Sequence, residues 1–220
     1  MRRLNLRTPS KNGANMLNNN LGKTPTPQQV LTQKGKRFGN NLDDGQGSSV
    51  IAYDHLQIAT GLNQQGTEFR FFENAANRAF PFTNLMEGRL PVAEGMVLKR
   101  IWFTMMSVVA ATGEILDEQT FAAYGLPGLY KSDFTFMNGN SRVIKPTPLS
   151  KQKAQWNWKG WNATSDIIHL DTDITLQPLI EFVCSLRIPT VTVPAVAGHT
   201  QWLGCYIEGP GAILNPRTNY

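Results

Sequence analysis

The chain has few of the residues that form metal and disulfide sites: 2 cysteines and 3 histidines among 220 residues. Cys184 and Cys205 have no paired spacing typical of a zinc site and are too few for a disulfide framework. Both are therefore predicted to be small buried residues. The histidines, His55, His169 and His199, are too scattered for the histidine cluster of a cupin-type metalloenzyme. Neither a metal nor a cofactor is expected.

Long apolar runs are also missing. The longest uncharged, mainly apolar run extends from Ile101 to Ala111, well short of the roughly 20 residues that span a bilayer. Arg2 and Arg3 are followed by polar residues instead of an apolar segment, so no secretion signal is expected. We expect a protein that is soluble or is brought to a membrane by others.

Common catalytic motifs are absent from the sequence. There is no G-x-S-x-G elbow, no H-E-x-x-H pair and no glycine-rich phosphate loop. His169, Asp171 and Asp173 are spaced by two, so on a strand they would share a face and could form a metal site or an acid–base pair. Because no fourth ligand lies nearby, we prefer to interpret them as a polar outer face. The chain is expected not to be an enzyme.

The first 42 residues contain no acidic residue but 8 of the 21 basic residues. From Asp43 onward, 13 basic and 16 acidic residues give a formal charge of about −3, so the basic character belongs to the N-terminal segment. That segment is rich in Asn, Gln, Thr and Pro and cannot bury enough apolar surface to offset its ordering entropy. Residues 1–47 are predicted to be an extended basic arm and residues 48–220 a folded domain. Such an arm can neutralise nucleic-acid phosphates or tie subunits together.

The most regular feature of the folded part is an unbroken run of β-branched, aromatic and thioether residues. Residues 96–110 contain neither Pro nor Gly and predict one long strand. Both faces are mostly apolar, with Ile101 and Phe103 on one face and Met96, Leu98, Trp102 and Met106 on the other. A half-solvated strand alternates apolar and polar residues, so this strand is expected to be covered on both sides, by a second sheet or a neighbouring subunit. The simpler alternative is a central sandwich strand with a few exposed apolar residues.

Weaker strand signals lie on both sides of this run. Asn138-Gly139-Asn140 predicts a tight hairpin turn, after which Pro146 and Pro148 are expected to end the pairing. Residues 113–120 predict a short helix or turn. Residues 174–188 fit a strand better than an amphipathic helix, because Pro178 and the β-branched residues disfavour a helix. Further strands are predicted at 50–59, 67–72, 131–137, 141–145, 166–172 and 201–208.

About eight strands without crossover helices or internal repeats predict an all-β fold, an antiparallel jelly-roll sandwich. The roughly 170 residues after the arm suit a single roll, and a compact double roll with minimal loops is the alternative. Trp156, Trp158 and Trp161 form an aromatic cluster. A core or interface role is preferred for this cluster over a platform for sugars or bases.

Three segments look like the first strands and the final strand of a known group of coat proteins. They are Glu68–Arg78 (EFRFFENAANR), Thr83–Phe103 (TNLMEGRLPVAEGMVLKRIWF) and Leu203–Leu214 (LGCYIEGPGAIL). The chain thus resembles the jelly-roll major capsid proteins of tailless icosahedral bacteriophages, including the tectivirus, corticovirus and finnlakevirus-like groups. The resemblance implies a structural virion protein that self-assembles into an icosahedral capsid around a genome or an internal membrane.

The resemblance also implies partners and contact residues. The expected partners are further copies of the chain, as homotrimers or capsomers and then a shell, other virion proteins, and viral nucleic acid or an internal membrane through the arm. The expected location is the virion, with the host cytoplasm during assembly. The expected assembly interface comprises Trp102, Met106, Trp156, Trp158 and Trp161. The expected arm contacts are Arg2, Arg3, Arg7, Lys11, Lys34, Lys36 and Arg37.

One alternative function stays open at this point. The chain could be a carbohydrate- or receptor-binding jelly roll in a minor virion or spike protein. In that case the tryptophan cluster would form the site, together with His169, Asp171 and Asp173.

Overall fold

The computed structural model describes residues 46–75, 78, 80–85, 88–92, 94–149 and 167–213. The basic residues predicted for arm contacts lie outside these ranges, as do Trp156, Trp158 and Trp161. The described part begins at Gln46, the first residue of the first strand, and the predicted domain division before Ser48 stays a prediction. Among the described residues, no helix has the length and apolar character needed to cross a membrane.

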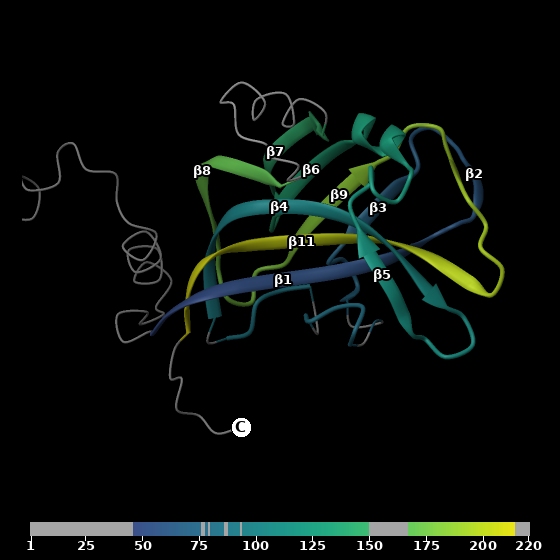
Figure 1. Cartoon of the computed structure of the whole chain (residues 1–220). Helices are drawn as coiled ribbons and strands as arrows, with labels where there is room; N and C mark the ends of the chain where they lie inside the picture. The colour runs from purple at the N-terminus through teal and green to yellow at the C-terminus, as the bar shows by residue number, and fades with distance from the viewer. Residues whose placement is uncertain are drawn as a thin grey trace, which may run out of the picture.

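One sheet has strands β11 and β4 at its centre (Figure 1). β11 pairs with β1 on one side and with β4 on the other, and the far edge of β4 is shared by β8 near its beginning and β5 near its end. We call this the front sheet. Its strands are β1 (Gln46–Ile58), β4 (Glu94–Val109), β5 (Ile115–Gln119), β8 (Ile168–Leu176) and β11 (His199–Ile213).

A second sheet, the back sheet, packs against the front sheet, and its strand order is β3-β9-β6-β7. Its strands are β3 (Glu68–Phe71), β6 (Asp133–Asn138), β7 (Ser141–Pro148) and β9 (Phe182–Arg187). Two short strands, β2 (Gly61–Asn63) and β10 (Val191–Val193), pair with each other, and a 3₁₀ helix spans Pro127–Lys131. All these pairings are antiparallel.

The strand pairing identifies the topology. In chain order the main described strands are β1, β3, β4, β6, β7, β8, β9 and β11. The first pairs with the last, the second with the seventh, the third with the sixth and the fourth with the fifth. This nested pairing over two sheets is that of a jelly roll. The predicted all-β jelly-roll sandwich is confirmed, and the described strands form a single roll.

The core lies between the two sheets, and β4 contributes much of it. Phe103 packs against Phe71 and Phe134 of the back sheet, with ring centroids 5.9 and 6.0 Å apart. The predicted division of the strand into two faces is wrong at Met96 and Leu98, which share the core with Phe103. The reason is an irregularity between Leu98 and Arg100, where the register shifts and the inward side changes from even to odd residues.

Two local predictions are wrong, and both concern strands at the edge of a sheet. Residues 113–120, predicted as a helix or turn, contain β5, which pairs with the end of β4. Pro146 and Pro148 do not end the hairpin, because β7 runs to Pro148. β7 lies at the edge of its sheet, so a proline there need not donate to a neighbouring strand.

The predicted strand over residues 174–188 is interrupted. β8 ends at Leu176, and β9 begins at Phe182 in the other sheet. The chain changes sheets through Pro178 and Leu179, and Leu179 has a φ of 61°. The preference for strand over helix is confirmed. The alternation of apolar and polar residues continues through the connection between β8 and β9, so this alternation does not show where β8 ends.

The cysteines behave as predicted. Cys184 in β9 and Cys205 in β11 are free and fully buried. Burial raises the pKa of the Cys205 thiol, and the neighbouring Cys184 raises it further. Both side chains therefore act as small apolar residues that pack the two sheets together.

Candidate functional site

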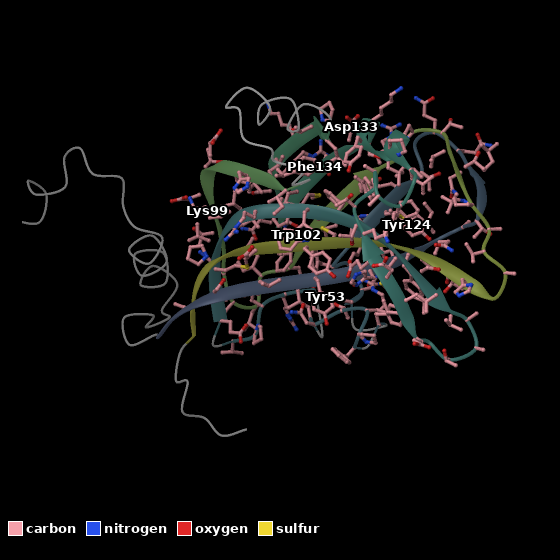
Figure 2. The ribbon with its side chains drawn as sticks, in the orientation of Figure 1. Tyr53, Lys99, Trp102, Tyr124, Asp133 and Phe134 are labelled. Atoms are coloured by element: carbon pink, nitrogen blue, oxygen red, sulfur yellow. The ribbon has the colours of Figure 1, made fainter. Side chains whose placement is uncertain are left out.

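A row of aromatic rings crosses the outer face of the front sheet, and Figure 2 labels two of its members, Tyr53 and Trp102. Tyr53 of β1, Tyr206 of β11 and Trp102 of β4 are direct cross-strand partners. The Trp102 and Tyr206 rings stack with their centroids 5.1 Å apart and an angle of 3° between their planes. The centroid of the Tyr53 ring lies 5.6 Å from that of Tyr206. All three side chains are partly exposed. The solvated face of an antiparallel sheet is usually polar, so this row places apolar surface where water is normally found.

Glu118 of β5 lies beside this row and binds three other strands. Its carboxylate accepts hydrogen bonds from Tyr206 Oη at 2.6 Å and from Thr104 Oγ1, and its Oε1 lies 3.1 Å from His55 Nε2. These three partners belong to β11, β4 and β1. One side chain thus ties the edge strand β5 across the whole width of the sheet. We call Tyr53, His55, Trp102, Thr104, Glu118 and Tyr206 the outer aromatic cluster.

The hydrogen bonds of His55 define where its ring carries a proton. Nδ1 lies 2.9 Å from the backbone oxygen of Phe82, which can only accept, so Nδ1 donates. Nε2 therefore faces the Glu118 carboxylate as the other ring nitrogen. The His55 side chain is 2 % exposed, whereas that of Glu118 is 28 % exposed. The pair is thus open to solvent from the β5 side.

The surroundings of the carboxylate shift the pKa values of the cluster. Burial alone would raise the pKa of Glu118, but its contacts with His55, Thr104 and Tyr206 outweigh burial and lower the pKa below its usual value. Burial and the hydrogen bond to Glu118 raise the pKa of Tyr206. Burial, with the nearby Glu118 charge, also raises the pKa of Tyr53. The cluster therefore holds an ionised carboxylate between neutral phenols at neutral pH.

The depressed pKa of Glu118 predicts a loss of stability in acid. The unfolded chain takes up this proton near pH 4.3, and the folded chain does so at lower pH. The contribution of Glu118 is therefore complete above that range and is lost as the pH falls through the folded pKa. In urea unfolding between pH 6 and pH 3, Glu118→Gln should show a shallower decline than wild type, and Thr104→Val an intermediate one. Equal declines in all three proteins would contradict this account.

Gly204 permits the close packing of the cluster. A Cβ atom at this position would lie 2.2 Å from Thr104 Oγ1 and 2.9 Å from the His55 ring. A glycine inside a strand often marks such a close approach, and this was the available sequence signal for the cluster. Sequence reasoning missed Glu118, because its segment was predicted as a helix or turn, and took His55 as an isolated residue.

The structure separates the two described residues of the predicted assembly interface. Trp102 is partly exposed at the end of the aromatic row, whereas Met106 is fully buried. Contact with a neighbour through Met106 would need the side chains above it to move. The interface role of both residues stays a prediction.

His169, Asp171 and Asp173 of β8 do not form a shared site. Asp173 pairs with Lys99 of β4, and His169 is the cross-strand partner of Arg100. Within the described ranges, no group of three His, Cys, Asp or Glu side chains is placed to hold a metal ion. The preferred interpretation of this segment as a polar outer face agrees with its exposed His169 and Asp171.

Comparisons with known proteins give one structural similarity. No protein-family model matches the chain, and no curated protein matches its sequence. The chain is similar to the crystal structure of the major capsid protein P2 from bacteriophage PM2, with 9 % identity and a TM-score of 0.36. The similarity covers 80 % of this chain and 48 % of that chain, so this chain spans about half the length of P2. The strand order by itself identifies the jelly-roll fold of this chain.

Proposed function

We propose that the protein is a structural coat protein that self-assembles into an icosahedral virion shell and has no enzymatic activity. The observation that carries the proposal is the outer aromatic cluster on the front sheet. One face of this sheet forms the core with the back sheet, and the opposite face bears Tyr53, Tyr206 and Trp102. An assembling shell can cover that second face with a neighbouring subunit.

The surroundings of the aromatic row have the composition of a protein interface. Tyr and Trp are enriched among the residues that contribute most to binding, and charged residues are usual at the rim. Arg100 and Glu208 form an ion pair of 3.0 Å beside the row. Ile51, two residues before Tyr53 on β1, is 46 % exposed. The aromatic row, the exposed Ile51 and the charged pair at the rim together favour a protein partner.

The rival function is carbohydrate or receptor binding. It was predicted at Trp156, Trp158 and Trp161, which lie outside the described residues, and the aromatic row gives it a second candidate site. A sugar that binds by stacking needs a free ring face. Trp102 and Tyr206 stack on each other, so one face of each ring is occupied and a sugar would have to stack on an outer face. A glycan array probed with wild type and with Trp102→Ala tests the rival function. A glycan that binds wild type but not Trp102→Ala would support it.

The basic arm supplies the remaining part of the proposal. Its 8 basic residues, with no acidic residue before Asp43, contrast with the described body, which has 9 basic and 12 acidic residues and a net charge of −3. We propose that the arm contacts viral nucleic acid, an internal membrane or neighbouring subunits, and that the protein resides in the virion after assembly in the host cytoplasm. Contacts to phosphates would weaken as salt increases.

Truncating Trp102 is expected to weaken self-association. A central aromatic residue of an interface contributes about 2 kcal/mol or more, which corresponds to roughly a thirtyfold loss of affinity. Sedimentation velocity of Trp102→Ala over a concentration series measures this loss. The matched control is Val143→Ala on β7, because Val143 is 42 % exposed on the back sheet. Equal association of Trp102→Ala and wild type would remove the front sheet from the proposed interface.

A further inference from the structure

Exposed apolar residues gather at the end of the roll where β1 begins. Two adjoining hollows share Asn84, Leu85, Leu90 and Pro91 and together form one open groove. Leu85 and Leu90 are buried at 6 % and 1 % exposure. We call this the apolar groove; its lining also includes Ile51 of β1, Arg89, Val92 and Leu179.

The residues at the rim of the groove are apolar and exposed. Val92 is 66 %, Leu179 50 % and Ile51 46 % exposed. Leu179 has a φ of 61°, which is costly for a residue with a Cβ, and its N–H donates to the oxygen of Leu90 at 3.1 Å. The backbone thus holds a leucine outward at the groove. An apolar surface held in this way is typical of a binding site.

The arm of the chain ends beside this groove. The described chain begins at Gln46, and Ser49, three residues later on the same strand, lines the groove. At about 3.4 Å per residue, the groove begins roughly 10 Å from the end of the arm. Figure 1 shows the beginning of β1 and the connection from β8 to β9, which contains Leu179, at the same end of the molecule.

The last part of the arm has residues that match the groove. Leu42 and Phe38 precede Gln46 by four and eight residues, which gives an extended reach of roughly 13 and 26 Å. Lys34, Lys36 and Arg37 come just before Phe38, and Glu94 lines the groove. Since the arm is tethered to β1, its effective concentration at the groove is on the order of millimolar. A molecule that is not tethered would need a similar concentration in solution to compete with the arm for the groove.

We propose that the apolar groove binds the arm of its own chain, with Phe38 and Leu42 placed against Val92 and Leu179. Binding would cover the exposed rim and place the basic residues before Phe38 near Glu94. The proposal does not rest on the coat role, because an arm bound within one chain is equally possible in a monomer and in a shell. It gives the arm a second binding partner besides a genome, a membrane or a neighbour.

Photo-crosslinking of the full-length chain tests this contact. Phe38 is replaced by p-benzoylphenylalanine, and a 1:1 mixture of ¹⁴N- and ¹⁵N-labelled protein is irradiated and analysed by mass spectrometry. We expect links to peptides that contain residues 85–92 or Leu179, with both peptides carrying the same isotope. Links with mixed isotopes would assign the groove to a neighbour's arm and overturn the proposal, and so would links spread evenly over the surface.

A charge in the groove provides the second readout. Val92→Asp in the same photo-reactive chain should lower the yield of groove links by about tenfold, because the aspartate disrupts an apolar contact. The matched control is Leu62→Asp, since Leu62 is 62 % exposed on β2, away from the groove. An unchanged yield in Val92→Asp, or an equal decrease in both variants, would also overturn the proposal. The oligomeric state, measured separately, reports on the coat role.

Discussion

Asp54→Asn is expected to lower the free energy of unfolding by about 3 kcal/mol or more. Asp54 of β1 points into the core and has no exposed surface. Its Oδ1 accepts from Arg78 Nε at 2.8 Å, and its Oδ2 accepts from Arg78 Nη2 and from the Phe72 N–H, both at 2.6 Å. An asparagine would remove the charge and turn one acceptor into a donor. Arg78, whose side chain is 17 % exposed, would then lose its counter-charge in a largely dry site.

A surface ion pair in the same region provides the control. Arg70 and Glu73 lie 3.1 Å apart with side chains 47 % and 35 % exposed. Exposed pairs of this kind contribute about 0 to 1 kcal/mol. Glu73→Gln should therefore shift the urea midpoint little, whereas Asp54→Asn should shift it strongly. Similar small shifts in both variants would contradict the assignment of Asp54 and Arg78 as a buried structural pair.

Gly209→Ala is expected to destabilise the fold by a comparable amount, about 3 kcal/mol. A Cβ atom at Gly209 would lie 1.8 Å from the backbone oxygen of Val97. Both atoms belong to the centre of the front sheet, where β11 and β4 change register between Glu208 and Gly211. Relief of the clash would need the two backbones to separate, and overpacking of this kind costs about 1 to 3 kcal/mol or more.

Gly128→Ala is the matched control for this substitution. A Cβ atom at Gly128 meets no atom within 4 Å, and the residue lies in the short 3₁₀ helix. Replacing a glycine where there is space changes stability by about 1 kcal/mol or less and tends to raise it, because the unfolded chain loses freedom. Thermal unfolding of the two variants should therefore differ in sign or at least clearly in size. A stable Gly209→Ala protein would mean that β4 and β11 lie further apart than described.

The parts of the fold that could be predicted are those that depend on local pattern. The run around Ile101 and Phe103 predicts a long strand by composition, and Asn138-Gly139 predicts a hairpin by turn chemistry. The irregularity at Lys99 could not be predicted, because it depends on how β8 and β11 pair with β4. The change of sheet at Leu179 was missed for a similar reason. The alternation of apolar residues continues through Leu179, although the backbone leaves the front sheet there and enters the back sheet.

The candidate site was only partly accessible from the sequence. Trp102 was identified because both faces of its predicted strand are mostly apolar, which predicts a covering partner on each side, and because the resemblance implies assembly. Its stacking partner Tyr206 comes from a strand far away in the sequence. Glu118 lies on the strand that follows β4, but it meets Tyr206 and His55 only because β11 and β1 pair beside β4 in the roll. No local pattern contains that information. The apolar groove is likewise formed by β1 and two distant connections.

The two surfaces share Ile51 at their border but have different centres, and they make separate predictions. The outer aromatic cluster lies on the front sheet, and we propose that it contacts neighbouring subunits. The apolar groove lies where β1 begins, and we propose that it holds the arm of the same chain. Trp102→Ala should therefore change self-association, whereas Val92→Asp should change the position of the arm.

The most direct test of the coat role is the mass distribution of the purified full-length protein, by light scattering together with negative-stain imaging, over a range of concentrations and salt. The account predicts trimers, capsomers or shells, with a distribution that depends on salt because the basic arm contributes to assembly. A monodisperse monomer at every concentration and salt would contradict self-assembly, and carbohydrate or receptor binding would then be the better explanation of the aromatic row.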